Sequence, residues 1–207
     1  MAITEYDVQP LFAEPYFRTK IGDAISDEQI EFLKNLKMVQ NKSNLISDNL
    51  YIFELPELKS IKDKVQEVLD LYASEIMGWT QRLYVTQSWS LVNNPNVGMH
   101  GHSHSNSLIS GSLYFCELPK PVASMIFDRH NNYQLLQFIP EPEKQNIYNT
   151  PMNIVTPEQG ELILFNSGLQ HLVETNTSNE PRYSLAFNTF IRGKMGDFRE
   201  VSELTIK

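Results

Sequence analysis

The chain has 207 residues and a formal net charge of −8, because 17 Lys and Arg residues stand against 25 Asp and Glu residues. This length predicts a single domain that buries a sizeable core without disulfides or metals. The acidic balance disfavours nucleic acid as a partner, since binding to phosphates relies on Lys and Arg. We expect neither secretion nor membrane insertion. Residues 1–10 lack the regions of a signal peptide, and no apolar run approaches the roughly 20 residues of a membrane span.

Cys116 is the only cysteine, so an intrachain disulfide is excluded. Its neighbours, residues 113–118, have the pattern of a strand, which predicts a buried and inert thiol. A chain without disulfides is typical of a reducing, intracellular compartment. These features together predict a cytoplasmic protein.

Two helices are predicted within residues 1–80. Ser26 and Gln29 have the spacing of a capping box, which predicts that a helix begins after Ser26. A second helix is predicted from about residue 56 to 77, ending near Gly78. Its apolar residues follow a period of 3.6 along one face: Leu58, Ile61, Val65, Val68, Leu69, Tyr72 and Ile76. We therefore expect residues 1–80 to form a helical N-terminal layer.

Short strands are predicted after Trp79. Apolar and polar residues alternate from Leu83 to Leu91, and further strands are expected at Leu108–Leu118, Val122–Phe127, Gln134–Ile139, Ile154–Val155, Glu161–Phe165, Gln170–Glu174 and Arg182–Arg192. Many short strands separated by turn residues predict a sandwich or barrel. We expect one domain over residues 1–207, mainly β. Its jelly-roll core would span residues 81–192, with the N-terminal α-helices packed on it, an exposed loop at 140–151 and a tail at 193–207.

Three of the five histidines have a spacing that suits a metal. His102 and His104 are two residues apart, and on a strand such residues face the same side. His171 follows a glycine turn at the expected start of another strand, where it would complete a site across the sheet. Neutral imidazole suits iron, zinc, copper and nickel. The H-x-H pair is a weak motif by itself, however, and a polar surface loop explains it as well.

The strand that begins at Arg182 has two unlike faces. One carries bulky apolar residues, and the other carries Arg182, Ser184, Ala186 and Asn188. A buried polar face needs hydrogen-bond partners, so this face is either solvated or lines a polar pocket. An arginine in such a pocket suits a carboxylate, which its planar guanidinium binds with two hydrogen bonds.

Residues 79–192 resemble the phage and bacterial 2-oxoglutarate/Fe(II)-dependent oxygenases related to prolyl 4-hydroxylases. The motifs that carry this resemblance are, in chain order, Trp89, His102-Ser103-His104-Ser105-Asn106-Ser107, Ser110-Gly111-Ser112-Leu113-Tyr114-Phe115, Phe165-Asn166-Ser167 with His171, and Arg182-Tyr183-Ser184-Leu185-Ala186-Phe187-Asn188. Each motif is weak alone, but their order and spacing together are specific. The resemblance implies a double-stranded β-helix, Fe(II) and 2-oxoglutarate as cofactors, and a bacterial or phage-infected host cell.

The family's iron site is formed by the pattern H-x-D/E…H. By position, the resemblance makes His102 and His171 metal ligands and places His104 where the family has a carboxylate. An all-histidine site carries one negative charge less than the usual triad of two histidines and a carboxylate. Asp128 is an alternative source of the carboxylate. His100 and His130 are expected to be structural or to support a ligand from behind.

The resemblance also implies a cosubstrate site. Arg182 matches the cation that binds the far carboxylate of 2-oxoglutarate, and Tyr114 matches a tyrosine that supports the same group. Asn188 lies on the same strand face as Arg182 and is expected to line the pocket. These roles predict a dioxygenase that uses O2 and 2-oxoglutarate, releases succinate and CO2, and hydroxylates a peptidyl side chain or a small metabolite.

Two other functions fit the same residues. A cupin-like metalloprotein would use the three histidines without 2-oxoglutarate. A non-catalytic jelly-roll would bind a partner or assemble, and an exposed Arg182 with diverging His102 and His104 side chains would favour it. The sequence predicts neither the substrate nor the oligomeric state.

Overall fold

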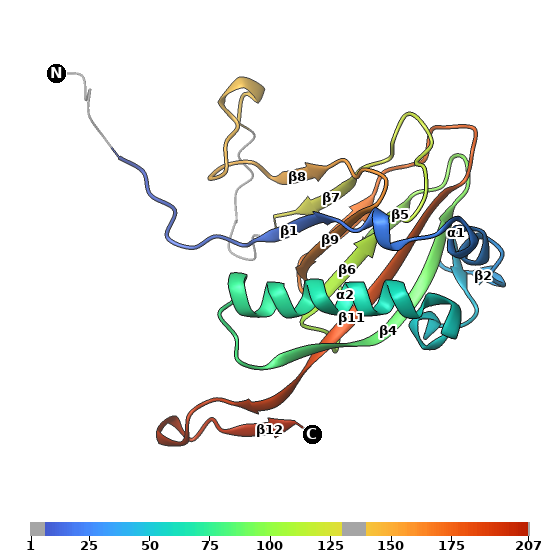
Figure 1. Ribbon diagram of the computed structural model, residues 1–207. Coiled ribbons are helices and arrows are strands. Elements are labelled where there is room, and N and C mark those ends of the chain that lie inside the picture. Colours follow the sequence, from blue (N-terminus) through green and yellow to red (C-terminus); the bar gives the residue numbers. More distant parts are fainter. Residues whose placement is uncertain (1–6, 130–139, 207) are drawn as a thin grey trace.

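Two β-sheets and two α-helices form the part of the chain that the computed structural model describes, residues 7–129 and 140–206 (Figure 1). The larger sheet has the order β1-β9-β6-β11-β4-β3-β2, with β12 paired to β11, and the smaller sheet has the order β5-β10-β7-β8. The strands of the larger sheet are β1 (Tyr16–Lys20), β2 (Met38–Gln40), β3 (Leu45–Ser47), β4 (Arg82–Asn93), β6 (Ile109–Leu113), β9 (Glu161–Asn166), β11 (Arg182–Met195) and β12 (Leu204–Ile206). Those of the smaller sheet are β5 (Met99–His102), β7 (Met125–Asp128), β8 (Met152–Val155) and β10 (His171–Val173). The mainly β architecture with helices is confirmed, whereas the strand predicted at 134–139 lies outside the described residues.

Both predicted helices are present. Helix α1 (Asp27–Lys34) begins with the predicted capping box, in which Ser26 and Gln29 bond to each other's backbone N–H groups. Helix α2 (Lys59–Leu71) continues into a π-helical turn (Tyr72–Ile76) before Gly78, which has a φ of +63°. A π-helical turn holds more than 3.6 residues, so the apolar face shifts beyond Tyr72. Ile76 is therefore 49% exposed, and not buried as its period predicts.

One face of the larger sheet packs against the helices. Its core joins side chains of α1 and α2 to those of the central strands: Leu33, Ile61, Val65, Leu69, Leu83, Leu113, Leu162, Leu164, Leu185 and Phe187. Gly111 is required in this layer, because a Cβ there would lie 2.1 Å from the Phe187 ring. Alternation along β6 and β11 then turns the polar residues of both strands towards the other face.

That other face is covered by the smaller sheet. A second core lies here: Tyr114, Leu118, Met125, Phe127, Val155, Ile163 and Phe165. Arg182, Ser184, Ala186 and Asn188 are all buried on this side, so the polar face of β11 is not solvated. The fold therefore places the predicted polar residues between two sheets.

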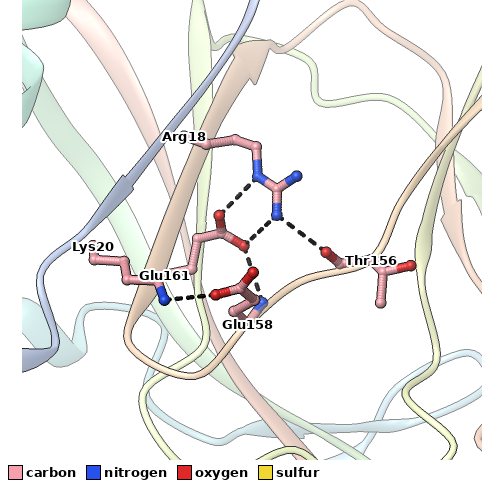
Figure 2. A network of polar contacts seen from close by, with 5 residues as sticks. All are labelled: Arg18, Lys20, Thr156, Glu158 and Glu161. Atoms are coloured by element: carbon pink, nitrogen blue, oxygen red, sulfur yellow. Dashed lines mark hydrogen bonds and ion pairs between the residues drawn. The ribbon is translucent and has the colours of Figure 1, made fainter.

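Residues 1–80 are more than the helical layer that the sequence predicts, because β1, β2 and β3 join the larger sheet. Figure 2 shows how β1 is attached to β9: the guanidinium of Arg18 donates to both carboxylate oxygens of Glu161, at 2.7 and 2.9 Å. Arg18 also donates to the Thr156 carbonyl, and Lys20 pairs with Glu158 at 2.6 Å. The hydrogen bonds that Arg18 donates to the Glu161 carboxylate raise the pKa of Arg18. A charged network thus fixes the N-terminal edge strand.

The segment predicted as a C-terminal tail is a hairpin. Strand β11 continues to Met195, and β12 pairs with its last three residues. Figure 1 shows this hairpin extending away from the two sheets. The loop expected at residues 140–151 is largely exposed, as predicted. In the described ranges, no helix is both long and apolar enough to span a membrane.

Candidate metal centre

Three histidine side chains meet at one end of the space between the sheets. His102 ends β5 and His171 begins β10, and the two residues are opposite each other in the antiparallel pair. One ring nitrogen from each of His102, His104 and His171 lies within 4.8 Å of those of the other two. The Nε2 atoms of His104 and His171 are 3.3 Å apart. The convergence predicted from the sequence is therefore present.

His104 reaches this point differently from the way its spacing suggests. Strand β5 ends at His102, so strand alternation does not orient His104. Its backbone N–H donates to the carbonyl of Ser167 at 2.9 Å, which ties the segment after β5 to the end of β9. Its ring stacks on Trp89 with a centroid distance of 5.9 Å and an interplanar angle of 20°.

Backbone carbonyls fix the orientation of two of the rings. His102 Nδ1 lies 2.9 Å from the carbonyl oxygen of His100, and His171 Nδ1 lies 2.9 Å from that of Leu169. A carbonyl only accepts, so each Nδ1 carries the proton and each Nε2 keeps a free lone pair. Histidines that bind a metal usually have such a partner behind the ring, so the two carbonyls fit that role.

Burial favours the neutral form of all three rings. Burial lowers the pKa of His104 to about 4. Burial likewise lowers the pKa of His171 to about 3 and lowers that of His102. Neutral imidazoles are the form that binds metals.

The spacing of these nitrogens fits a shared metal ion. Two imidazole nitrogens bound to one metal at about 2.0–2.1 Å lie roughly 2.8–3.0 Å apart at an octahedral angle of 90° and roughly 3.3–3.4 Å apart at a tetrahedral angle. The Nε2 atoms of His104 and His171 have this separation. Three neutral nitrogen donors that converge in this way therefore suit a divalent transition metal.

A cavity of about 190 Å³ extends from the histidines between the sheets. Its walls include the three histidines, Trp89 and the polar face of β6 and β11, together with apolar residues and a group of asparagines: Ile46, Leu91, Met99, Met125, Phe165, Val173, Asn41, Asn44 and Asn93. Arg182 and Tyr114 also line it. A single cavity thus connects the three converging histidines with a buried cation.

Arg182 is 2% exposed, yet its Nε and Nη2 atoms have no hydrogen-bond partner, and neither does the hydroxyl of Tyr114. No ion pair in the described part of the chain involves Arg182. A buried cation and a buried hydroxyl without partners are costly in a folded protein. Their shared position on the cavity wall fits a bound carboxylate, which accepts hydrogen bonds from both.

The remaining predicted residues lie elsewhere. Asn188 is not among the described residues that line the cavity; its amide oxygen accepts from Ser110 Oγ at 2.9 Å. Asp128 is not part of the histidine group, and its backbone N–H donates to Gln170. His100 is exposed and contributes its carbonyl, and His130 lies outside the described residues.

The backbone contacts of the ligands were not predicted from the sequence. The carbonyls of His100, Leu169 and Ser167 become recognisable only once the strands are paired. A carbonyl has no residue-specific signal, so the sequence contains no pattern that could reveal these contacts.

The segment that carries the site matches a known family. Residues 87–188, about half of the chain, match the model of the family described as "Putative 2OG-Fe(II) oxygenase". All six residues predicted for the metal and the cosubstrate lie in this segment, and the resemblance predicted from the sequence is confirmed. Iron and 2-oxoglutarate, the cofactors that the sequence predicts, are the two that this description names. No curated protein matches the chain in sequence.

Solved structures share the fold at low sequence identity. A Pseudomonas putida prolyl-4-hydroxylase has a TM-score of 0.59 and 12% identity, over 87% of this chain and 94% of that one. The α-ketoglutarate-dependent epimerase SnoN from nogalamycin biosynthesis has a TM-score of 0.62 and 12% identity, over 86% and 76%. HygX from Streptomyces hygroscopicus, with nickel, 2-oxoglutarate and hygromycin B bound, has a TM-score of 0.57 and 12% identity, over 85% and 82%.

Proposed function

We propose that this protein is an Fe(II)- and 2-oxoglutarate-dependent oxygenase that hydroxylates its substrate. The observation that carries the proposal is the pair of unpartnered groups on Arg182 and Tyr114, which line the same cavity as three converging histidines. A metal site alone fits many proteins. A metal site that shares a cavity with a buried carboxylate receptor fits a chelating ligand with a second carboxylate.

Each of these side chains has a defined role in the proposal. His102, His104 and His171 hold Fe(II) through their Nε2 atoms, which the carbonyls behind two of the rings leave free. Arg182 and Tyr114 bind the far carboxylate of 2-oxoglutarate. When bound, Fe(II) and 2-oxoglutarate supply the activation of O2 and the oxidising power, with succinate and CO2 as products. The protein orients both and keeps water away through the apolar cavity wall.

The substrate class and the reaction type are the finer part of the proposal. Proteins that share this fold include a prolyl-4-hydroxylase and an epimerase, so the fold does not fix the reaction. We propose hydroxylation of a peptidyl side chain or a small metabolite. The two facing sheets, with α1 and α2 on the outer face of the larger one, support a double-stranded β-helix within one domain. The buried free thiol of Cys116 supports a cytoplasmic location.

The two alternative functions have less support. A non-catalytic jelly-roll is disfavoured, because Arg182 is buried and the histidine side chains converge. A cupin-like metalloprotein without 2-oxoglutarate would leave the unpartnered groups of Arg182 and Tyr114 unexplained.

Addition of Fe(II) and 2-oxoglutarate under anaerobic conditions tests the proposal. We expect a weak visible charge-transfer band that requires both additions, because the band arises only when 2-oxoglutarate chelates the bound iron. Fe(II) binding without the band, together with no 2-oxoglutarate binding by calorimetry, would support the cupin-like alternative. Absence of metal binding would support the non-catalytic one.

A further inference from the structure

We propose that the side chains of Asn41, Asn44 and Asn93 bind a neutral amide group of the substrate, either a peptide bond or a primary carboxamide. The inference rests on the proposed function, because it names the substrate class of the same cavity. Asn41 and Asn44 precede residues 87–188, the segment that matches the family model, so the family match does not account for them.

The cavity has little fixed charge to offer a substrate. Apart from the histidines, Arg182 is the one charged side chain among the described residues that line it, and that lining includes no Asp, Glu or Lys. In the proposed function, Arg182 is occupied by the far carboxylate of 2-oxoglutarate. A charged group of the substrate would then be buried without a counter-ion, which is costly. We therefore expect the part of the substrate that enters the cavity to be neutral.

Three asparagines of the cavity wall are joined through their carboxamides. Asn41 Nδ2 donates to Asn44 Oδ1 at 3.1 Å, and Asn44 Nδ2 donates to Asn93 Oδ1 at 2.9 Å. Asn93 Nδ2 in turn lies 3.5 Å from the carbonyl oxygen of Val97. Since a carbonyl only accepts, this contact orients Asn93 and, through it, the other two carboxamides.

Each of these carboxamides keeps hydrogen-bonding capacity for a ligand. An asparagine side chain donates two hydrogen bonds, yet within the described ranges each of the three donates only one. Asn41 Oδ1 accepts none there. Asn44 and Asn93 are 3% and 2% exposed, so bulk water satisfies little of this capacity. Buried polar groups are normally paired, which favours a polar ligand at this wall.

The unused groups complement an amide that is flanked by hydrocarbon. Asn41 offers an acceptor oxygen and a second N–H, and an amide supplies the matching N–H and carbonyl oxygen. The adjoining part of the wall is apolar: Ile46 follows Asn44 by two positions, and Leu91, its partner on β4, precedes Asn93 by two. A sugar would bury hydroxyl groups against these side chains, so an amide fits the wall better.

The turn that carries Asn41 and Asn44 is fixed by its own hydrogen bonds. It connects β2 to β3, and the Asn41 N–H donates to the Asn44 carbonyl at 2.8 Å. Gln40 Nε2 donates to the carbonyls of both residues, at 2.8 and 3.3 Å. Ser43 Oγ lies 3.7 Å from Met99 Sδ, which joins the turn to β5. These contacts place the two side chains on the cavity wall before a ligand binds.

The asparagines lie at a distance from the metal centre. Asn93 is four residues from Trp89 on β4, and the Trp89 ring stacks on His104. Four residues of a strand span roughly 13 Å. A substrate whose amide is held by the asparagines therefore presents to the histidines a carbon several bonds away from that amide.

Binding of small amides to the loaded protein tests the inference. The protein is saturated with Co(II) and 2-oxoglutarate, and calorimetry measures its affinity for three probes: N-acetyl-leucinamide, hexanamide and hexanoate. We expect both amides to bind. Hexanoate should bind at least about tenfold more weakly than hexanamide, because its charge has no counter-ion in the cavity.

Two variants of the turn separate recognition from folding. Asn41→Leu should bind both amides about two- to tenfold more weakly, the usual effect of losing a neutral hydrogen bond, and should bind 2-oxoglutarate as tightly as the wild type. Asn41→Asp, which lacks the N–H groups, should weaken amide binding in the same direction. The matched control is Lys42→Ala, which changes an exposed residue of the same turn outside the cavity lining and should bind the amides with wild-type affinity.

The outcomes distinguish the inference from the proposed function. A loaded wild type that binds neither amide, or binds hexanoate as tightly as hexanamide, overturns the inference alone. So does a folded Asn41→Leu with unchanged amide affinity, or, if that variant does not fold, such an Asn41→Asp. Tighter binding of N-acetyl-leucinamide than of hexanamide supports a peptide as the substrate, and the reverse order supports a small carboxamide. A wild type that binds no Co(II) or no 2-oxoglutarate contradicts the proposed function, and the inference with it.

Discussion

The guanidinium carbon of Arg182 lies 5.1 Å from the centre of the Tyr114 ring, and the polar ends of both side chains lack partners. A cation over an aromatic face is attracted by the partially negative π face of the ring, more strongly when water is excluded. This contact holds Arg182 against the cavity wall before any anion binds. The two residues are therefore held in the arrangement that the proposed carboxylate site requires.

Replacement of Arg182 by alanine should weaken 2-oxoglutarate binding by at least about tenfold. A buried hydrogen bond between charged groups is worth roughly 1.5–3 kcal/mol, and about 1.4 kcal/mol corresponds to a factor of ten. Metal affinity should hardly change, because Arg182 is not among the converging ligands. Calorimetric titration of 2-oxoglutarate into the metal-loaded Arg182→Ala variant measures the effect.

Arg192→Ala is the matched control for this experiment. Arg192 belongs to the same strand and lies over the Tyr84 ring at 4.2 Å, but it is exposed and outside the cavity. The Arg192→Ala variant should bind 2-oxoglutarate with the affinity of the wild type. If Arg182→Ala and Arg192→Ala bind it equally well, Arg182 is a structural residue and the cosubstrate proposal loses its main support.

Tyr114→Phe should separate binding from stability. The variant removes a buried hydroxyl without a hydrogen-bond partner and keeps the ring. The metal-free variant should melt at the wild-type temperature or above it, because an unsatisfied buried polar group destabilises the folded state. Its affinity for 2-oxoglutarate should fall by about tenfold, since a hydrogen bond to a charged group contributes about 1.5 kcal/mol or more. A lower melting temperature with unchanged affinity would instead make Tyr114 a core residue only.

Acid should destabilise the metal-free protein through its buried histidines. In the folded protein the pKa of His104 is about 4 and that of His171 is about 3, against 6.5 for an ordinary histidine. Below pH 6.5 the unfolded chain binds protons that the folded chain does not. The free energy of unfolding should therefore fall as the pH decreases from 6.5 towards 4. This contribution is fully present above pH 6.5.

Urea unfolding at pH 7.5 and at pH 5, with a chelator present, measures this loss. His104→Gln should lose less stability between the two pH values than the wild type, because one buried titrating group is gone. His100→Gln, which changes an exposed histidine of the same segment, should show the wild-type loss. An identical loss in His104→Gln and the wild type would show that His104 does not titrate as its burial requires.

The long elements of this fold were predictable because their patterns repeat several times. Helix α2 shows its period in four buried residues, Ile61, Val65, Val68 and Leu69, and β11 shows two unlike faces over seven residues, Arg182 to Asn188. The strands β1, β2, β3, β5 and β12 contain three to five residues each, too few for alternation to exceed chance. They form because the sheet offers them partners, as Arg18 shows by pairing with Glu161 from a distant part of the chain.

The site was predictable in its residues more than in its geometry. The convergence of His102 and His104 was inferred from strand alternation, but β5 ends at His102 and a backbone bond to Ser167 places His104. Asn188 lies on the same face of β11 as Arg182, but it does not line the cavity, and its amide oxygen accepts a hydrogen bond from Ser110. These contacts join residues about 60 to 80 positions apart, which leave no local pattern in the sequence. The three histidines were therefore predictable, and the hydrogen bonds that place the side chains were not.

His104→Asp tests whether the third ligand must be an imidazole. The substitution restores the carboxylate of the usual iron triad and adds one negative charge beside the proposed Fe(II) site. We expect Fe(II) affinity at least equal to that of the wild type, measured by anaerobic calorimetry. The metal-free variant should be less stable by about 1–2 kcal/mol, because the ring that stacks on Trp89 is lost.

His100→Asp is the control for charge alone. It adds the same negative charge to the same segment, at an exposed residue whose ring lies 5.4 Å from that of His102 and is not part of the converging group. An equal gain in Fe(II) affinity in both variants would mean that the added negative charge attracts the ion from a distance. The aspartate at position 104 would then not be a metal ligand. A folded His104→Asp that binds Fe(II) much more weakly than the wild type would show that the protein requires an imidazole at this position.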